Sequence, residues 1–263
     1  VWEGIREAVA EANDHTDSPV DAVAVSAIGD VVIPCAADYT PVRRAIVDFD
    51  PRGQRELDEF VSRFGERRFF ETTGMPPLFI GSLAKILWIK KHEPEIFEAA
   101  ARWATFEDFI VQKLMCERAY ASYSEAARTM LFDIRKKEWA GGVLDQAGLC
   151  SWQMPAAVPS ARILGRISAE TMRELKFKAH AMVVSGGHDM VCAAVGAGLD
   201  EADPQTAVNI AGTIEGIVAC LKEPNTGAAM LENRFPCYPG HKEYVTFSVN
   251  LTAGCVVRWF RDL

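Results

Sequence analysis

Short apolar runs alternate with stretches of helical periodicity along most of the chain. Apolar residues at helical spacing predict a helix over residues 1–13, and a nearly continuous apolar run over 20–26 is typical of a buried strand in an α/β sheet. Residues 31–33 are expected to pair with that strand or to extend it. Further helices are expected over 53–64, 85–91, 96–103 and 106–114, an irregular Pro-rich stretch over 151–165, and a strand over 182–185. This alternation predicts an α/β fold.

Two glycines and an acidic residue follow the last of these strands. Gly186 and Gly187 permit a sharp turn and the close approach of a ligand to the backbone, and Asp189 precedes a small, apolar run that is expected to be helical. A carboxylate at the end of a strand can accept a proton from a substrate hydroxyl. The alternative is that Asp189 serves only as a helix N-cap.

A second glycine-containing turn lies in residues 207–218. An apolar strand leads to Gly212 and Thr213, and another apolar run follows, which is the layout of a phosphate-contacting hairpin. A plain hairpin turn remains the alternative. The acidic, Pro-containing stretch at 199–205 predicts a connector between two domains.

The composition of the chain indicates which classes of partner it does not bind and which cellular compartment it occupies. The net charge of −8 over 263 residues argues against binding to nucleic acid or to an acidic membrane surface, and no apolar run has the length that spans a bilayer. Seven scattered cysteines, an odd number, predict buried free thiols in a reducing compartment and therefore the cytoplasm. They lack zinc-ligand spacing and the five histidines do not cluster, so metal ligands stay unassigned.

Taken in order, these segments resemble the FGGY carbohydrate kinases, and the xylulose-kinase-like members most closely. The motifs that carry the resemblance include residues 22–52, 73–76, 84–88, 92–97 and 124–130, Asp133 and Trp139. The resemblance implies a ribonuclease-H/actin-like ATPase fold. It places a first lobe, without its opening phosphate hairpin, at residues 1–199 and the beginning of a second lobe at 205–263.

By the same resemblance, the protein uses ATP and Mg²⁺ to phosphorylate a primary hydroxyl of a small sugar or polyol, with a pentulose such as xylulose favoured. Asp189 falls on the position of the general base, and Gly212 and Thr213 fall on the phosphate-contacting turn. Ile214 stands where relatives often carry a hydroxyl residue.

The sugar side departs from the family pattern. Relatives carry a Gln-Met-His-Gly-like run where this chain has residues 28–31, so Gly29 and Asp30 are candidate sugar contacts, and a turn aspartate is the alternative for Asp30. Asp50 and Arg52 line the sugar pocket or form a structural ion pair, which is the favoured role. His188 is a further candidate sugar contact beside Asp189.

Two other functions stay open at this point. A non-catalytic sugar-binding or regulatory relative fits the altered sugar loop, and an actin-like ATPase is disfavoured by the sugar-kinase motifs at 73–76 and 88–97. The sequence leaves open the sugar and the oligomeric state, a homodimer included. We expect the 263-residue chain alone to bind ATP weakly and not to turn over sugar.

Overall fold

The computed structural model describes residues 1–263 except 200–202, 204, 213–214 and 251–252. Its helices are α1 (Trp2–Asp14), α2 (Gln54–Phe64), α3 (Glu66–Thr73), α4 (Ser82–His92), α5 (Pro94–Ala99), α6 (Phe106–Met115), α7 (Tyr123–Arg128), α8 (Gly141–Ala147), α9 (Ala169–Glu174), α10 (Asp189–Gly196), α11 (Ala228–Glu232) and α12 (Gly254–Arg261), with a 3₁₀ turn at Ser151–Gln153. Its strands are β1 (Ala22–Ala27), β2 (Ile33–Cys35), β3 (Arg102–Ala104), β4 (Tyr120–Ser122), β5 (Phe132–Asp133), β6 (Glu138–Trp139), β7 (Ala156–Val158), β8 (Ile163–Arg166), β9 (Met182–His188), β10 (Ala207–Ala211), β11 (Glu215–Leu221), β12 (Cys237–Pro239) and β13 (Tyr244–Asn250). The alternation of strands and helices confirms the α/β prediction.

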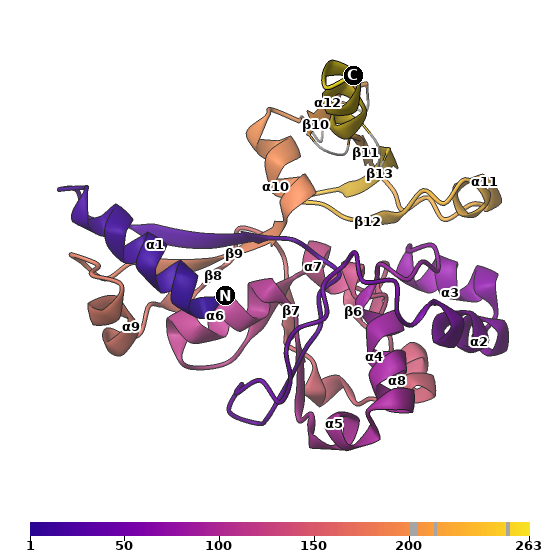
Figure 1. The fold of residues 1–263 in the computed structure, drawn as a ribbon, viewed down its shortest axis with the longest axis horizontal. Coiled ribbons are helices and arrows are strands. Elements are labelled where there is room, and N and C mark those ends of the chain that lie inside the picture. Colours follow the sequence, from indigo (N-terminus) through magenta and orange to yellow (C-terminus); the bar gives the residue numbers. More distant parts are fainter. Residues whose placement is uncertain (200–202, 204, 213–214, 251–252) are drawn as a thin grey trace.

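Two sheets organise the chain. A three-stranded sheet of order β1-β9-β8 lies in the first part, and a four-stranded antiparallel sheet of order β10-β11-β13-β12 follows α10. Figure 1 shows α12 above α10 and the second sheet above and to the right of α10, while α2, α4, α5 and α8 form a helical layer at the lower right. Strand β9 leads from the first group to the second through α10.

The pairing of β1 with β9 is parallel and contains one irregularity. Ala24 lies opposite Val184, but Ser26 lies opposite Gly187, so β9 carries one residue more than β1 in this interval. Such a bulge leaves the extra residue outside the regular ladder. A side chain at Gly186 has no room here, because a Cβ would lie 1.9 Å from the Val25 carbonyl oxygen.

One large apolar cluster joins the two groups. It contains Leu57 and Phe60 of α2 and also Tyr238 and Val245 of the four-stranded sheet. A smaller cluster fastens α6 and α9 to β1 and β9. Because the large cluster is continuous, the four-stranded sheet is fixed against the helical layer by buried apolar surface.

Three local expectations were wrong. Strand β2 pairs with β3 and not with β1, and the helix expected over 96–103 ends at Ala99, before β3. The Pro-rich stretch 151–165 contains β7 and part of β8. The cysteines are all free, as expected, but only Cys35, Cys220 and Cys237 are fully buried, and Cys116 and Cys150 are exposed.

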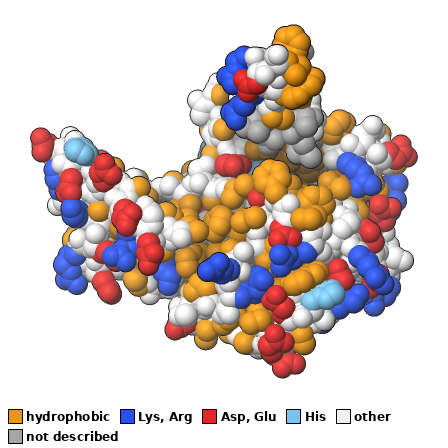
Figure 2. Space-filling view, viewed as in Figure 1, with side chains coloured by type: hydrophobic (Ala, Val, Ile, Leu, Met, Phe, Trp, Pro, Cys, Tyr) orange, Lys and Arg blue, Asp and Glu red, His pale blue; other side chains and the backbone are white. Residues whose placement is uncertain are grey.

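The surface is uneven in its charge. Figure 2 shows charged side chains at both ends of the larger body and apolar side chains across its centre and on the projecting upper part. That upper part carries exposed apolar residues of α12, with Val257, Trp259 and Phe260 at 70%, 60% and 74% exposure. Among the described helices, none combines the length and the hydropathy needed to cross a membrane.

Candidate active site

Asp189 is the first residue of α10, directly after β9. His188 occupies the N-cap position, so Asp189 lies at the positive end of the helix dipole rather than capping the helix. Its Oδ1 accepts the Met190 N–H at 2.6 Å, and its side chain is 48% exposed. Burial raises the pKa of Asp189, while the Met190 N–H and Arg128 oppose the rise. Within the described residues Oδ2 has no hydrogen-bond partner, so one oxygen is left for a substrate.

His188 lies behind this carboxylate and is 4% exposed. Its Nδ1 lies 3.0 Å from the Tyr238 hydroxyl, and its Nε2 lies 3.4 Å from Asp189 Oδ1. Burial and the nearby Arg128 hold the pKa of His188 well below its ordinary value, so the ring is neutral. From this network we assign the tautomer in which Nδ1 accepts from Tyr238 and Nε2–H points at Asp189.

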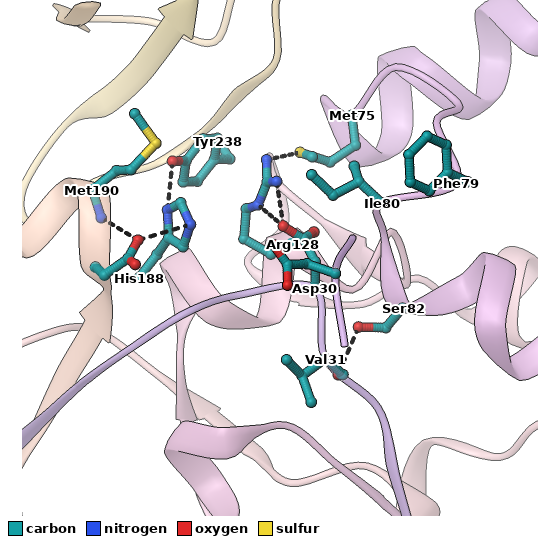
Figure 3. Close-up of polar contacts among 12 residues, drawn as sticks. Asp30, Val31, Met75, Phe79, Ile80, Ser82, Arg128, His188, Met190 and Tyr238 are labelled. Carbon is teal, nitrogen blue, oxygen red and sulfur yellow. Dashed lines mark hydrogen bonds and ion pairs between the residues drawn. The ribbon is translucent and has the colours of Figure 1, made fainter. Parts of the chain in front are cut away.

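Asp30 and Arg128 form a buried ion pair beside His188. Arg128 Nε donates to Asp30 Oδ2 at 3.0 Å, and its NH2 group donates to the same oxygen. Figure 3 shows the guanidinium between Asp30 and Met75, whose sulfur it also contacts. Burial raises the pKa of Asp30, and Arg128 opposes that rise. The other oxygen, Oδ1, is buried and has no partner within the described residues.

The backbone conformation at residues 29–30 allows the side chains of Asp30, Arg128 and His188 to lie close together. A Cβ on Gly29 would lie 2.9 Å from Arg128 Cγ and 3.0 Å from His188 Cδ2, so only glycine permits this packing. Asp30 adopts a left-handed conformation with φ of 70°, which short polar residues tolerate best. Asp30 thus stands at a bend of the backbone, while its side chain pairs with Arg128.

Lys85 supplies a second buried cation near Asp30. Its ammonium donates to the carbonyl oxygens of Asp48, Phe79 and Ile80, at 3.3 Å for Asp48 and 2.8 Å for Phe79. Burial lowers the pKa of Lys85 to about 8, against the attraction of Asp30, Asp48 and Asp50. Lys85 thus ties the loop after β2 to the residues that precede α4.

Asp50 and Arg52 pair with each other. Arg52 Nε lies 2.8 Å from Asp50 Oδ1, and its guanidinium lies 4.6 Å from the centre of the Trp88 ring. Both side chains are partly exposed, at 34% for Arg52 and 24% for Asp50. This geometry favours the structural role over a sugar contact.

The Gly212 turn is described only in part. Thr213 and Ile214 lie outside the described residues. Gly212 is exposed and its carbonyl accepts the Gly254 N–H at 3.1 Å. Strand β11 of the same hairpin packs on the start of α10, because a Cβ on Gly216 would lie 2.7 Å from Met190 Cε. The hairpin that carries Gly212 is therefore attached to the residue after Asp189.

Arg128 and Tyr238 are site residues that sequence reasoning did not single out. Arg128 pairs with Asp30, and its guanidinium carbon lies 5.7 Å and 5.3 Å from the ring centres of Tyr238 and Phe247. A buried arginine needs a partner, but the sequence alone does not show that Arg128 is buried. Among the described residues, no group of three or more His, Cys, Asp or Glu is arranged to hold a metal ion.

The sequence is similar to those of known xylulose kinases and autoinducer-2 kinases. The chain is 28% identical over 224 residues to a xylulose kinase of Bacillus subtilis, covering 85% of this chain and 44% of that protein. It is 29% identical over 223 residues to an autoinducer-2 kinase of Klebsiella pneumoniae, covering 83% of this chain and 41% of that protein. The chain thus spans less than half the length of these relatives.

Solved structures share the fold. A gluconate kinase from Lactobacillus acidophilus superimposes with a TM-score of 0.91 at 20% identity, over 99% of this chain and 52% of that one. A ligand-bound xylulose kinase from the same organism gives the same TM-score, identity and coverage. The chain therefore has the actin-like ATPase fold of these kinases over about half of their length.

A family model identifies the first part of the chain directly. The model of the FGGY family of carbohydrate kinases, N-terminal domain, matches residues 1–196, which include every element from α1 to α10. With the acid at the end of β9 and the fold of the solved kinases, the chain belongs to the FGGY family of carbohydrate kinases.

Proposed function

We propose that the protein transfers the γ-phosphoryl group of ATP to a primary hydroxyl of a small sugar or polyol, with Asp189 as the general base. The observation that carries the proposal is the half-exposed Asp189 carboxylate, with Oδ1 held by the Met190 N–H and Oδ2 without a partner among the described residues. Phosphoryl transfer needs mostly positioning and charge stabilisation, together with one group that orients the attacking hydroxyl.

In this mechanism Oδ2 of Asp189 accepts the hydroxyl proton as the substrate oxygen attacks the γ-phosphorus. The new oxygen–phosphorus bond forms as the bond to the β-phosphate oxygen breaks, and ADP leaves. His188 Nε2–H points at Oδ1 and keeps the carboxylate in its orientation. Burial raises the pKa of Asp189, which makes it a stronger base than an ordinary aspartate.

The sugar side of the proposal rests on Gly29, Asp30 and His188. Oδ1 of Asp30 is buried and has no partner in the described part of the chain, so it is suited to accept a hydrogen bond from a sugar hydroxyl, since Oδ2 is already held by Arg128. The xylulose kinase relatives favour a pentulose as the substrate. The autoinducer-2 kinase relatives make autoinducer-2 the second compound to assay.

ATP and magnesium are proposed as the donor and its metal. The phosphates are placed beside the Gly212 turn, whose hairpin packs on Met190. Magnesium in phosphoryl transfer is held by one or two carboxylates and the phosphates themselves, so the lack of a three-carboxylate group among the described residues fits it. When bound, the metal neutralises charge on the transferring phosphoryl group.

Asp189→Asn in the complete gene product tests the proposal. The amide preserves shape but cannot take the proton, so we expect the phosphorylation rate to fall by roughly 10²- to 10⁴-fold with the fold intact. Asp145→Asn, at an exposed position of α8, is the matched control and should leave the rate unchanged. Near-wild-type turnover of Asp189→Asn would remove Asp189 as base. No phosphorylation of any sugar by the wild type would favour the non-catalytic sugar-binding alternative.

A further inference from the structure

A chain of buried hydrogen bonds runs from α6 to the residue before Asp189. Glu107 Oε2 contacts the Ser122 hydroxyl at 2.8 Å, the Ser122 hydroxyl contacts the Ser124 hydroxyl at 3.1 Å, and the Ser124 hydroxyl accepts the His188 N–H at 3.1 Å. Glu107, Ser122 and Ser124 are all fully buried. We call this set the Glu107 relay.

All hydrogen bonds of the Glu107 relay can be assigned with the donors pointing the same way, from His188 toward Glu107. The Ser124 oxygen accepts from the His188 N–H, and its own proton is then available to Ser122. The Ser122 oxygen also accepts the Glu125 N–H at 3.2 Å as the N-cap of α7, so its proton goes to Glu107. Glu107 Oε2 accepts the Ser122 N–H as well, at 2.8 Å. Each hydroxyl therefore donates once, and the relay ends on Glu107 Oε2, which accepts from both the hydroxyl and the N–H of Ser122.

The Glu107 carboxyl group also lies near the bulge of β9. The backbone N–H of Gly186 acts to lower the pKa of Glu107, against the rise that burial causes. The carboxyl group is thus linked to the backbone of β9 at His188 through two hydroxyls, and it lies near Gly186 as well. His188 immediately precedes Asp189.

We propose that Glu107, acting through Ser122 and Ser124, is a positioning residue that sets where Asp189 lies. This inference rests on the proposed role of Asp189 as general base. Breaking the relay frees the backbone at His188, and the carboxylate of Asp189 then loses its alignment with the substrate hydroxyl. A displacement of about 1 Å at a reacting group can cost roughly 10²-fold in rate.

Ser124→Ala cuts the relay with the loss of one oxygen atom. We expect kcat to fall roughly tenfold with the KM for ATP little changed, because the geometry of the base and not nucleotide binding is altered. Hydrogen exchange at the His188 amide should rise by roughly fivefold, the loss of one hydrogen bond. Ser185→Ala is the matched control, because Ser185 is a buried serine on the same strand whose hydroxyl has no partner within the described residues.

Two substitutions at Glu107 test the far end of the relay. Gln keeps an acceptor oxygen for Ser122, so Glu107→Gln should retain most of kcat, whereas Glu107→Leu removes the acceptor and should lower it. If Glu107→Leu does not fold, Ser124→Ala and Glu107→Gln still decide the question. A wild-type kcat in Ser124→Ala, or an unchanged hydrogen-exchange rate at the His188 amide in that variant, would overturn the proposed role of the relay. A loss of kcat in Ser185→Ala equal to that in Ser124→Ala would overturn it as well.

The outcome separates this inference from the proposed function. A protein in which Asp189→Asn is inactive while Ser124→Ala is fully active keeps the general base and loses the relay. A protein in which Asp189→Asn is fully active loses the proposed function, and the exchange measurement at His188 still reports whether the hydrogen bond exists.

Discussion

The hydroxyl of Tyr238 on β12 lies 3.0 Å from Nδ1 of His188 at the end of β9. This contact joins the four-stranded sheet to the strand that delivers Asp189. The ring of Tyr238 lies edge-on to His188 and to Phe247, with ring centres 5.9 Å apart in both cases. The contact between β12 and β9 therefore combines aromatic ring packing with a hydrogen bond.

Tyr238→Phe removes the polar part of that junction. We expect the free energy of unfolding to fall by roughly 0.5–1.5 kcal/mol, because Nδ1 of a buried, neutral histidine loses its donor. Thermal or denaturant unfolding measures the change. Tyr120→Phe, at a half-buried tyrosine on β4, is the control and should lower stability less. Equal stability of the Tyr238 variant and the wild type would contradict a stabilising hydrogen bond between Tyr238 and His188.

Asp30→Ala leaves the buried guanidinium of Arg128 without its carboxylate. Breaking one side of a buried pair costs roughly 3–5 kcal/mol, so we expect a large loss of stability. Asp50→Ala breaks a partly exposed pair and should cost about 0–1 kcal/mol, which makes it the matched stability control.

Asp30→Asn separates the two roles proposed for this residue. The amide keeps the shape of the side chain. If Oδ1 of Asp30 contacts the sugar, the KM for the sugar should rise by a factor equivalent to roughly 1–3 kcal/mol. Calorimetric titration of the sugar measures it. A sugar affinity equal to that of the wild type would leave Asp30 with a structural role alone.

The pH dependence of the rate should report the Asp189 base. Its pKa in the folded protein lies above 3.8, so kcat/KM should fall as pH decreases through that raised value and the base is protonated. The residual rate of Asp189→Asn should lack this acidic limb. The same limb in the variant would assign it to another group.

The pH dependence of stability should report the buried acids of α6. Burial raises the pKa of Glu107 to about 8 and that of Asp108 to about 7. The folded state therefore keeps protons that the unfolded state has released, and stability falls as pH rises from about 4.5 to about 8. In Glu107→Gln, which cannot titrate, melting temperatures measured across this range should decline less steeply. An unchanged decline would contradict the raised pKa of Glu107.

The sequence predicted the elements whose pattern is local. The apolar run ending at Asp189 became β9 and α10, and the hairpin at 207–218 became β10 and β11. The partner of β2 could not be predicted in this way. Strand β3 is three residues long and continues the apolar pattern of the preceding helix, so only tertiary packing distinguishes it.

The same limit applies to the candidate site. Asp189 was predicted from its short motif at the end of a strand, and Asp30 and His188 from the resemblance to the FGGY kinases. Arg128 contacts Asp30 across 98 residues, and Ser124 contacts His188 across 64. Spacing along the chain carries no information on such pairs, so these residues became apparent only with the fold.

The extra residue in β9 fixes the length of this segment as well as its shape. Side chains on a strand alternate between two faces, so removing or adding one residue between Val184 and Gly187 would exchange the faces of all that follow. His188 would then turn away from Tyr238, and α10 would start with its acid on the wrong side. Loop grafts across this junction must therefore keep the number of residues between Val184 and Gly187 unchanged.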